Sequence, residues 1–390
     1  MMLSLFSWVV LALYANAATV EVRKAQPVTI PLSSRKIAPG EGVQRRALAA
    51  ANLGLKDYFN GTDLHCIHAD QKSSIDGKLI EPNAVGTPPQ TLSVVFDTGS
   101  TSLEFASTLC GATCSRQKKF DSTKSSTFTD GGRTQSITFG TGVGVDPVIG
   151  NNWQLSLRSA TDVVSIAGLN AGRVSLFLIT NQTPTFSPEP FDGIQGMGPR
   201  LTGTFAGLAN QGLPALFSML LTPNSVGGAE LTLGGIDSTK FQGNLVYADN
   251  EESSFWGLTS SAITVNGKTS TTLRQSREYL PDTKAVYALI SPNIKANAAE
   301  PGTFGIPCSQ VSTLPAVISF TFTSQSGQSF DLTIPSSELS VGPFRSNPTL
   351  CQTLINADDS FNIIGASLLK HYYSVWDIGN QRMGFAPNVH

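Results

Sequence analysis

The candidate chemistry of this chain lies in one short stretch, Asp97-Thr98-Gly99-Ser100, which follows the apolar run Val94-Val95-Phe96. β-Branched and aromatic residues favour a buried strand, so the sequence predicts that Asp97 stands at the end of a rigid strand. Gly99 permits a sharp turn because it has no Cβ, and the two hydroxyls can donate hydrogen bonds to the carboxylate. A carboxylate held in this way could activate a water molecule. Most Asp-Thr-Gly triplets, however, are ordinary turns at strand ends.

The motifs around this turn narrow the interpretation. Gly86-Thr87-Pro88-Pro89-Gln90 precedes it, and Phe191-Asp192-Gly193-Ile194-Gln195-Gly196-Met197-Gly198 follows it. This order resembles the pepsin-like aspartic proteases, in which each of two lobes carries one Asp-Thr/Ser-Gly turn and the two carboxylates share a proton. Further stretches similar to that family continue to the end of the chain, at 230–237, 255–258, 262–267, 280–282, 362–365 and 372–386.

The resemblance implies an all-β fold of two β-rich lobes with a central cleft. It also implies an aspartic endopeptidase that hydrolyses peptide bonds in proteins at acid pH, as a monomer and without metal or cofactor. Composition agrees with the fold class, because charged residues make up only 14% of the 390 residues and small and β-branched residues are abundant. A net charge of −2 gives no electrostatic footprint for nucleic acid.

The first 74 residues are predicted to be processing segments. Residues 1–17 have an apolar core and end in Ala15-Asn16-Ala17, which is typical of a secretory signal peptide. The protein is therefore expected to be secreted and extracellular, with a vacuolar location as the alternative, and no later apolar run is long enough for a membrane anchor. Residues 18–74 begin with a basic stretch and a short strand pattern at 28–32, which resembles the propeptide of a zymogen in this family. A flexible linker is the alternative interpretation of this segment.

We expect the N-terminal lobe at 75–222 and the C-terminal lobe at 223–390. In the first lobe, residues 136–142 are predicted to form a strand and a glycine-rich hairpin tip, which the resemblance identifies as the flap over the substrate. The residues that the resemblance assigns to substrate binding are Gly99, Ser100, Phe139, Gly140 and Thr141. The family usually has a Tyr at the position of Phe139 and commonly a Trp at that of Glu104, so the polar contact of the flap is built differently here. Asp192 is expected to have a structural role.

The five cysteines suggest two disulfides and one remaining thiol. Cys110–Cys114 and Cys308–Cys351 have spacings similar to disulfides of the resembled family, and a secreted protein can oxidise them. The odd residue, Cys66, lies in His65-Cys66-Ile67-His68, whose spacing does not match common zinc sites. We therefore expect no metal site there. Asn60-Gly61-Thr62 and Asn181-Gln182-Thr183 are sequons for glycosylation.

The resemblance fails at one point, because the second Asp-Thr/Ser-Gly turn is missing between Gly267 and Leu280. Counting back from Leu280, Thr272 falls where the second catalytic Asp belongs. Two carboxylates about 3 Å apart share one proton, and a single carboxylate lacks that partner. Three explanations remain open: an inactive relative that binds peptides or inhibitors in the same cleft, a wrongly predicted exon boundary, or rescue by a neighbour such as Glu278.

Overall fold

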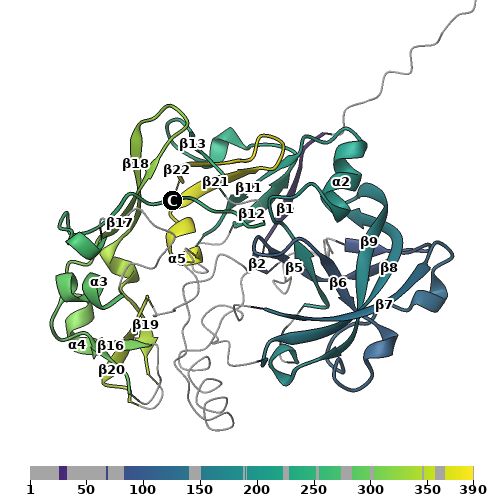
Figure 1. The fold of residues 1–390 in the computed structure, drawn as a ribbon, viewed down its shortest axis with the longest axis horizontal. Helices are drawn as coiled ribbons and strands as arrows, with labels where there is room; N and C mark the ends of the chain where they lie inside the picture. The colour runs from purple at the N-terminus through teal and green to yellow at the C-terminus, as the bar shows by residue number, and fades with distance from the viewer. Residues whose placement is uncertain are drawn as a thin grey trace, which may run out of the picture.

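The computed structural model describes residues 26–32, 67–68, 83–139, 151–187, 189, 191–222, 228–251, 254–273, 283–298, 303–344, 347–355 and 365–389. Strands dominate these residues and form four sheets, while the helices are few and short. In Figure 1, the blue and teal strands of one lobe lie on one side, the green and yellow strands of the other lobe lie opposite, and a six-stranded sheet lies between them. The predicted all-β, bilobal fold is confirmed.

The nine-stranded sheet belongs to the first lobe. Its strands are, in spatial order, β2 (Ile67–His68), β5 (Val94–Asp97), β10 (Gly193–Gly196), β6 (Leu103–Ala106), β9 (Leu169–Gln182), β8 (Gln154–Ile166), β3 (Asn83–Val85) and β4 (Gln90–Leu92), with β7 (Thr129–Thr138) paired to β8. β5 and β10 are parallel neighbours. The single α-helix described in this part, α2 (Gly203–Asn210), packs against β9, and short 3₁₀ turns lie at η1 (Thr108–Cys110), η2 (Ser122–Lys124) and η3 (Pro184–Phe186).

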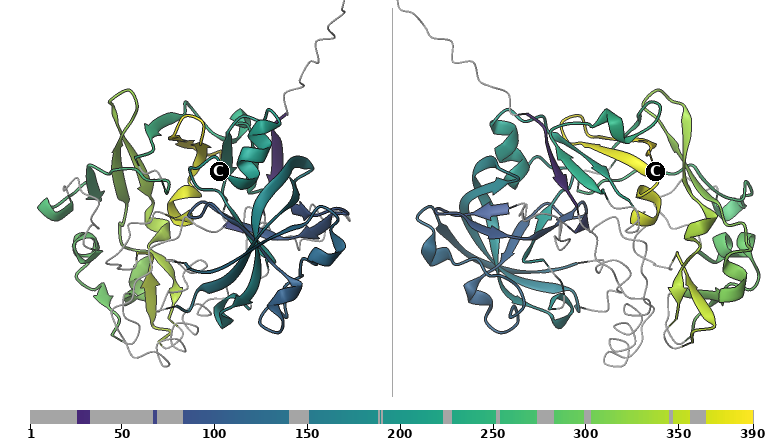
Figure 2. Two further views of the ribbon diagram at one scale, coloured as in Figure 1. Left: turned by 45° about the vertical axis from the view of Figure 1, so that its right-hand side comes forward. Right: turned by 180° about the vertical axis from the view of Figure 1, so that it is seen from behind.

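The six-stranded sheet joins segments from both ends of the chain. Its order is β1 (Val28–Pro31), β12 (Glu230–Leu233), β11 (Leu216–Leu220), β21 (Tyr372–Asp377), β22 (Arg382–Pro387) and β13 (Val246–Asp249). The strand expected at 28–32 is therefore present, and Figure 2 shows it in purple along the teal strands of this sheet. The 3₁₀ turn η4 (Ser238–Lys240) follows β12. The lobe boundaries at 74/75 and 222/223 stay predictions.

The second lobe contains two smaller sheets. One has three strands, β14 (Ala262–Val265), β17 (Ile318–Thr323) and β18 (Ser329–Ile334). The other has four, β15 (Lys295–Ala296), β16 (Phe304–Pro307), β20 (Leu350–Thr353) and β19 (Ser340–Pro343). Short helical segments lie between and after these strands: η5 (Thr271–Leu273), α3 (Thr283–Ile290), α4 (Cys308–Val311), η6 (Ser336–Glu338) and α5 (Ala366–Leu369).

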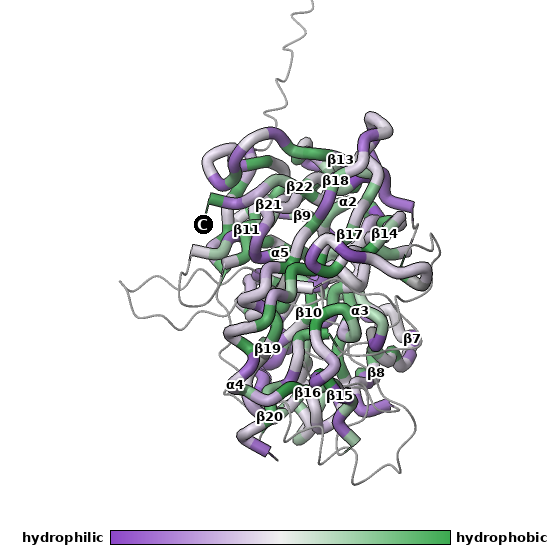
Figure 3. The backbone as a smooth tube through the Cα atoms, turned by 90° about the vertical axis from the view of Figure 1, so that its left-hand side faces the viewer, coloured by the Kyte–Doolittle hydropathy of each residue, from purple (hydrophilic) through white to green (hydrophobic). Residues whose placement is uncertain are grey.

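Side-chain alternation gives the nine-stranded sheet two different faces. Successive residues of a strand point to opposite faces, and hydrophobic and hydrophilic residues alternate along many of the tubes in Figure 3. Val94 and Phe96 pack into the largest hydrophobic core, whereas Val95 and Ile194 belong to a second core. Asp97 lies two residues beyond Val95 and so falls on the face of this second core.

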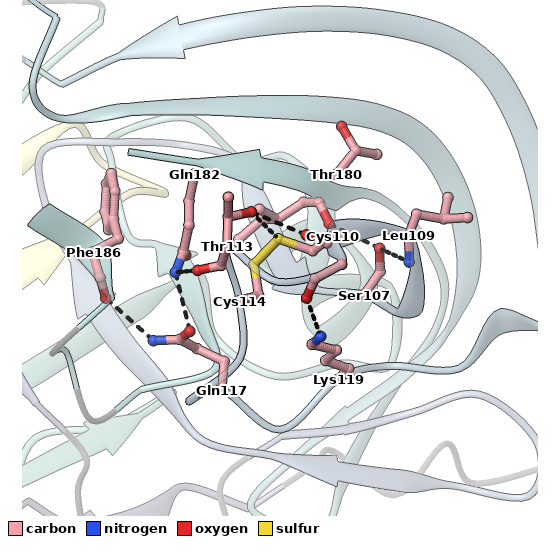
Figure 4. The surroundings of a disulfide bond; sticks show 12 residues. Ser107, Leu109, Cys110, Thr113, Cys114, Gln117, Lys119, Thr180, Gln182 and Phe186 are labelled. Carbon is pink, nitrogen blue, oxygen red and sulfur yellow. Dashed lines mark hydrogen bonds between the residues drawn. A yellow bond between two sulfur atoms is a disulfide. The ribbon is translucent and has the colours of Figure 1, made fainter. Parts of the chain in front are cut away.

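Both expected disulfides are present. Cys110–Cys114 joins cysteines 4 positions apart in the first lobe, and Cys308–Cys351 joins cysteines 43 positions apart in the second. Around the first, the Gln182 amide donates to the Thr113 carbonyl at 2.8 Å and to the Gln117 side chain at 3.0 Å, which ties the loop to β9 (Figure 4). Cys66 lies outside the described residues. No helix in the described part of the chain is long and apolar enough to cross a membrane.

Candidate active site

Asp97 occupies the place that the sequence predicted, at the end of a buried strand. All four residues of β5 are buried, and Asp97 is 4% exposed. The backbone then turns, with the Gly99 N–H donating to Asp97 Oδ1 at 2.9 Å and the Ser100 N–H donating to the Asp97 carbonyl at 3.4 Å. The carboxylate is therefore held by its own turn, as an acid–base group must be if its direction is to be fixed.

β10 locks this turn from the neighbouring position in the sheet. Gly196 lies opposite Asp97, and the N–H groups of Met197 and Gly198 donate to the carbonyls of Asp97 and Ser100 at 2.6 and 2.8 Å. β10 can also pack closely against β6 because it carries glycines: a Cβ on Gly193 would lie 2.2 Å from the Glu104 carbonyl oxygen. The glycines of the motif at 191–198 are therefore explained by the close packing of β10 against its neighbouring strands.

Asp192 has the structural role that was expected of it. Its Oδ2 accepts hydrogen bonds from the Ser93 N–H at 2.9 Å and the Ser93 hydroxyl at 2.8 Å, and its Oδ1 accepts one from the Lys118 N–H at 2.6 Å. Burial raises the pKa of this carboxyl, while these hydrogen bonds oppose the rise. Asp192 therefore fastens the start of β10 to the segment before β5.

The candidate substrate-binding residues fall into three groups. Gly99 and Ser100 are half-buried beside Asp97. Phe139 directly follows β7, where its N–H donates to the Trp153 carbonyl at 2.9 Å and its ring packs edge-on against Phe186 at 5.7 Å. Gly140 and Thr141, the predicted flap tip, lie outside the described residues, so the position of the tip over Asp97 stays a prediction.

Phe139 also contacts the second core, the one that contains Val95 and Ile194. The base of the predicted flap therefore rests on the same face of the sheet that carries Asp97. A cavity of about 390 Å³ among the described residues lies between β9 and α2 and is lined by residues 171–175, 203, 206, 207, 210 and 211. It does not include Asp97, so the substrate cleft stays a prediction as well.

Glu104 is a buried acid near the Asp97 turn, and its burial was not expected from the sequence. It is fully buried in β6, and its Oε1 accepts a hydrogen bond from the Ser102 hydroxyl at 2.5 Å. Burial raises the pKa of this carboxyl to about 8, the Ser102 hydrogen bond opposes the rise, and the negative charge of Asp97 adds to it. The signal in the sequence was a charged residue inside the otherwise apolar strand Leu103-Glu104-Phe105-Ala106.

The second lobe presents no matching carboxylate in the part that is described. β14 ends at Val265, and Asn266 and Gly267 form a tight turn with φ of 51° and 73°. The chain then forms η5, in which Leu273 is buried in the main core. Residues 274–282 lie outside the described part, and Thr272 is described in its backbone alone. Among the described residues there is also no cluster of three His, Cys, Asp or Glu side chains that could hold a metal ion.

Comparison with known proteins agrees with the geometry of the first lobe. The family model "Eukaryotic aspartyl protease" matches residues 80–388. Pepsin A of Suncus murinus is 29% identical over 371 residues, which cover 89% of this chain and 90% of that protein. Rhizopuspepsin-1 of Rhizopus niveus is 31% identical over 323 residues, covering 78% of this chain and 77% of that protein. The chain belongs to the eukaryotic aspartyl protease family, whose pepsin-like members are aspartic endopeptidases.

Proposed function

We propose that this chain is an aspartic-type endopeptidase that hydrolyses peptide bonds of protein or peptide substrates at acid pH, with Asp97 as the group that activates water. One observation carries the proposal. In a member of the aspartyl protease family, Asp97 is buried at the end of β5 and its carboxylate is fixed by the Gly99 N–H. Gly99, Ser100, Phe139, Gly140 and Thr141 are the proposed substrate contacts.

The chemistry assigned to Asp97 is that of a general base. An ionised carboxylate can accept a proton from water as the water oxygen attacks the peptide carbonyl. The family reaction uses a second carboxyl that is still protonated, because two adjacent carboxylates cannot both be charged. Since no acidic residue occurs between Ala262 and Leu273, we expect slow cleavage by the chain as it stands.

The second candidate function is peptide or inhibitor binding without catalysis. The specific observation in its favour is η5 (Thr271–Leu273), which carries no acidic residue and includes Thr272, the position at which we expect the second catalytic Asp. A chain that keeps the cleft and one carboxylate would still offer hydrogen-bonding groups to an extended peptide. Binding and cleavage are therefore measured separately in the test.

The test uses the full chain after acidification, with a denatured protein as substrate and pepstatin as inhibitor. The endopeptidase proposal expects measurable, pepstatin-sensitive cleavage that disappears in Asp97→Asn. Pepstatin binding without cleavage supports the second candidate. Neither binding nor cleavage, in a chain whose far-ultraviolet circular dichroism shows β-structure, contradicts both.

Secretion, activation and assembly belong to the same proposal. We propose a signal peptide at 1–17, a zymogen segment at 18–74, and a monomeric, secreted glycoprotein, with the vacuole as the alternative location. Asn181 supports glycosylation because it is exposed on β9, whereas Asn60 lies outside the described residues. Recovery of the protein from culture medium, with a mass that falls after glycosidase treatment, checks both features.

A further inference from the structure

Glu104 and Asp97 lie on the same face of the nine-stranded sheet. Glu104 pairs with Ile194 on β10 and with Phe177 on β9, and Ile194 in turn pairs with Val95 on β5. These four residues form one row across the strands. Asp97 stands two residues beyond Val95, so its side chain points to the same face as Glu104, one row further along.

A short chain of hydrogen-bonded groups joins the two acids. The Ser102 hydroxyl donates to Glu104 Oε1 at 2.5 Å, and the Ser102 carbonyl accepts the Gly196 N–H at 2.7 Å. Gly196 is the residue paired with Asp97 in the parallel ladder. Ser102 and Gly196 therefore link the Glu104 carboxyl to the Asp97 turn.

The surroundings of Glu104 favour its neutral form. The residues beside it on β10 and β9, Ile194 and Phe177, carry no charge, and the one titratable group that acts on it is Asp97 on β5, which is itself acidic. Glu104 Oε2 is buried and has no hydrogen-bond partner among the described residues. Burial of an uncompensated carboxylate is costly, so the proton stays on Glu104 at pH values at which an exposed glutamate has lost it.

We propose that Glu104 is a positioning residue for Asp97: its carboxyl accepts the hydrogen bond of the Ser102 hydroxyl and stays neutral beside the Asp97 turn, and its ionisation, which adds a second negative charge to that face, sets the upper pH limit at which the site binds a ligand. The inference rests on the proposed function, since the ligand is a substrate-like peptide. It adds a second carboxyl to the site from the same lobe. When Glu104 loses its proton, a second negative charge is added to the face that carries Asp97, and the described residues beside Glu104 supply no cation to balance it.

A direct titration tests the proposal without any need for activity. The infrared band of a protonated carboxylic acid is recorded across the pH range in the full chain, in Glu104→Gln and in Asp97→Asn. We expect a band that persists at about pH 6, disappears near pH 8 and is missing in Glu104→Gln, because the folded pKa lies above the usual value of 4.5. We expect the disappearance to shift to lower pH in Asp97→Asn. Ionised Glu104 at pH 6, or a titration that Asp97→Asn does not move, overturns the proposal.

Ligand binding provides the second arm, with pepstatin as the probe. In the unaltered chain the dissociation constant should rise as pH increases toward about 8, whereas Glu104→Gln, which stays neutral and keeps an acceptor for Ser102, should show no such rise. Glu104→Leu should bind about tenfold more weakly at every pH, since Ser102 loses its acceptor. Asp130→Asn, an exposed acid on β7, is the matched control and should keep the original profile. A rise that persists in Glu104→Gln contradicts the positioning role.

If no variant binds pepstatin, the proposed function fails while the titration still decides the pairing of the two acids. Stability supplies a measurement for that case. The folded chain holds the Glu104 proton between pH 4.5 and about 8 while the unfolded chain releases it. The free energy of unfolding should therefore fall as pH rises through this window, and it should fall less in Glu104→Gln. Equal slopes in both chains contradict a proton held by Glu104.

Discussion

The two lobes differ at the place where the family has its Asp-Thr/Ser-Gly turn. In the first lobe, β5 lies inside a continuous sheet between β2 and β10, and Asp97 ends a strand whose neighbours are hydrogen-bonded on both sides. In the second lobe, the strands divide between a three-stranded and a four-stranded sheet, and the described stretch after β14 forms one 3₁₀ turn. A carboxylate can be aimed only where its strand is fixed by neighbours. By that criterion, the turn at Asp97 is the one catalytic-type turn with a fixed carboxylate in the described part of the chain.

The largest effect is expected from introducing an Asp-Thr-Gly turn into the second lobe. Replacing Thr272-Leu273-Arg274-Gln275 with Asp-Thr-Gly-Thr should increase cleavage of a denatured protein at acid pH by about 10²–10⁴-fold, since a paired acid restores general acid–base catalysis. Initial rates of peptide release provide the measurement.

The matched control for the restored chain carries Asp97→Asn as well and should be inactive. If the unaltered chain already cleaves as fast as the restored one, another group completes the carboxyl pair. Glu104 is then the first residue to examine. Sequencing the transcript across codons 265–285 decides separately whether the missing turn is a property of the natural protein.

The local motifs predicted much of the first lobe, since each depends on residues that are close in sequence. The strand and turn at Asp97, the strand at 28–31, the structural part of Asp192 and both disulfides are present as expected. Glu104 could not be understood in that way. Its cross-strand neighbours, Ile194 and Phe177, lie far away in sequence and meet β6 only in the folded sheet.

The pairing of β2 with β5 was also missed. β2 is only two residues long, and its segment has no alternation of apolar and polar residues that would predict a strand. The sequence drew attention to Phe139 because the family usually has a Tyr there, and the packing of its ring against Phe186 in the structure was not predicted. In each case the decisive partner comes from another strand, which the sequence of the segment alone does not specify.

In the described part of the chain each lobe contains one disulfide, so the free energy that each bridge contributes to stability can be compared. Cys308–Cys351 joins residues 43 apart, and Cys110–Cys114 joins residues 4 apart. In the chain-entropy model, replacing both cysteines of the longer bridge with Ala should lower the free energy of unfolding by about 4 kcal/mol, and of the shorter one by about 2 kcal/mol. Urea titration of the two double variants measures the difference. Equal losses would show that packing around each bridge, and not loop length, determines its contribution.

A substitution at Asp192 measures how much its hydrogen bonds to Ser93 and Lys118 stabilise the first lobe. Asp192→Ala leaves the Ser93 N–H, the Ser93 hydroxyl and the Lys118 N–H without their acceptor, so the free energy of unfolding should fall by about 2–4 kcal/mol. Thermal unfolding followed by circular dichroism provides the measurement. Asp130→Ala, which removes an exposed ion pair with Arg158, should cause a much smaller loss. A loss at Asp192 no larger than that control would mean that water replaces the carboxylate at little cost.

The smallest effect concerns the close approach of β10 to β6, which has no described counterpart in the second lobe. A Cβ at position 193 would lie 2.2 Å from the Glu104 carbonyl oxygen, a backbone atom that cannot swing aside. Gly193→Ala should therefore push the two strands apart and lower the free energy of unfolding by about 1–3 kcal/mol. Gly379→Ala is the matched control, because its Cβ would meet no atom closer than 3.6 Å. Hydrogen exchange at the Gly196 N–H, which bonds to the Ser102 carbonyl, should accelerate in the first variant and not in the second. Unchanged exchange in Gly193→Ala would show that β10 yields without disturbing the Asp97 turn, and that the glycine is not needed to hold it.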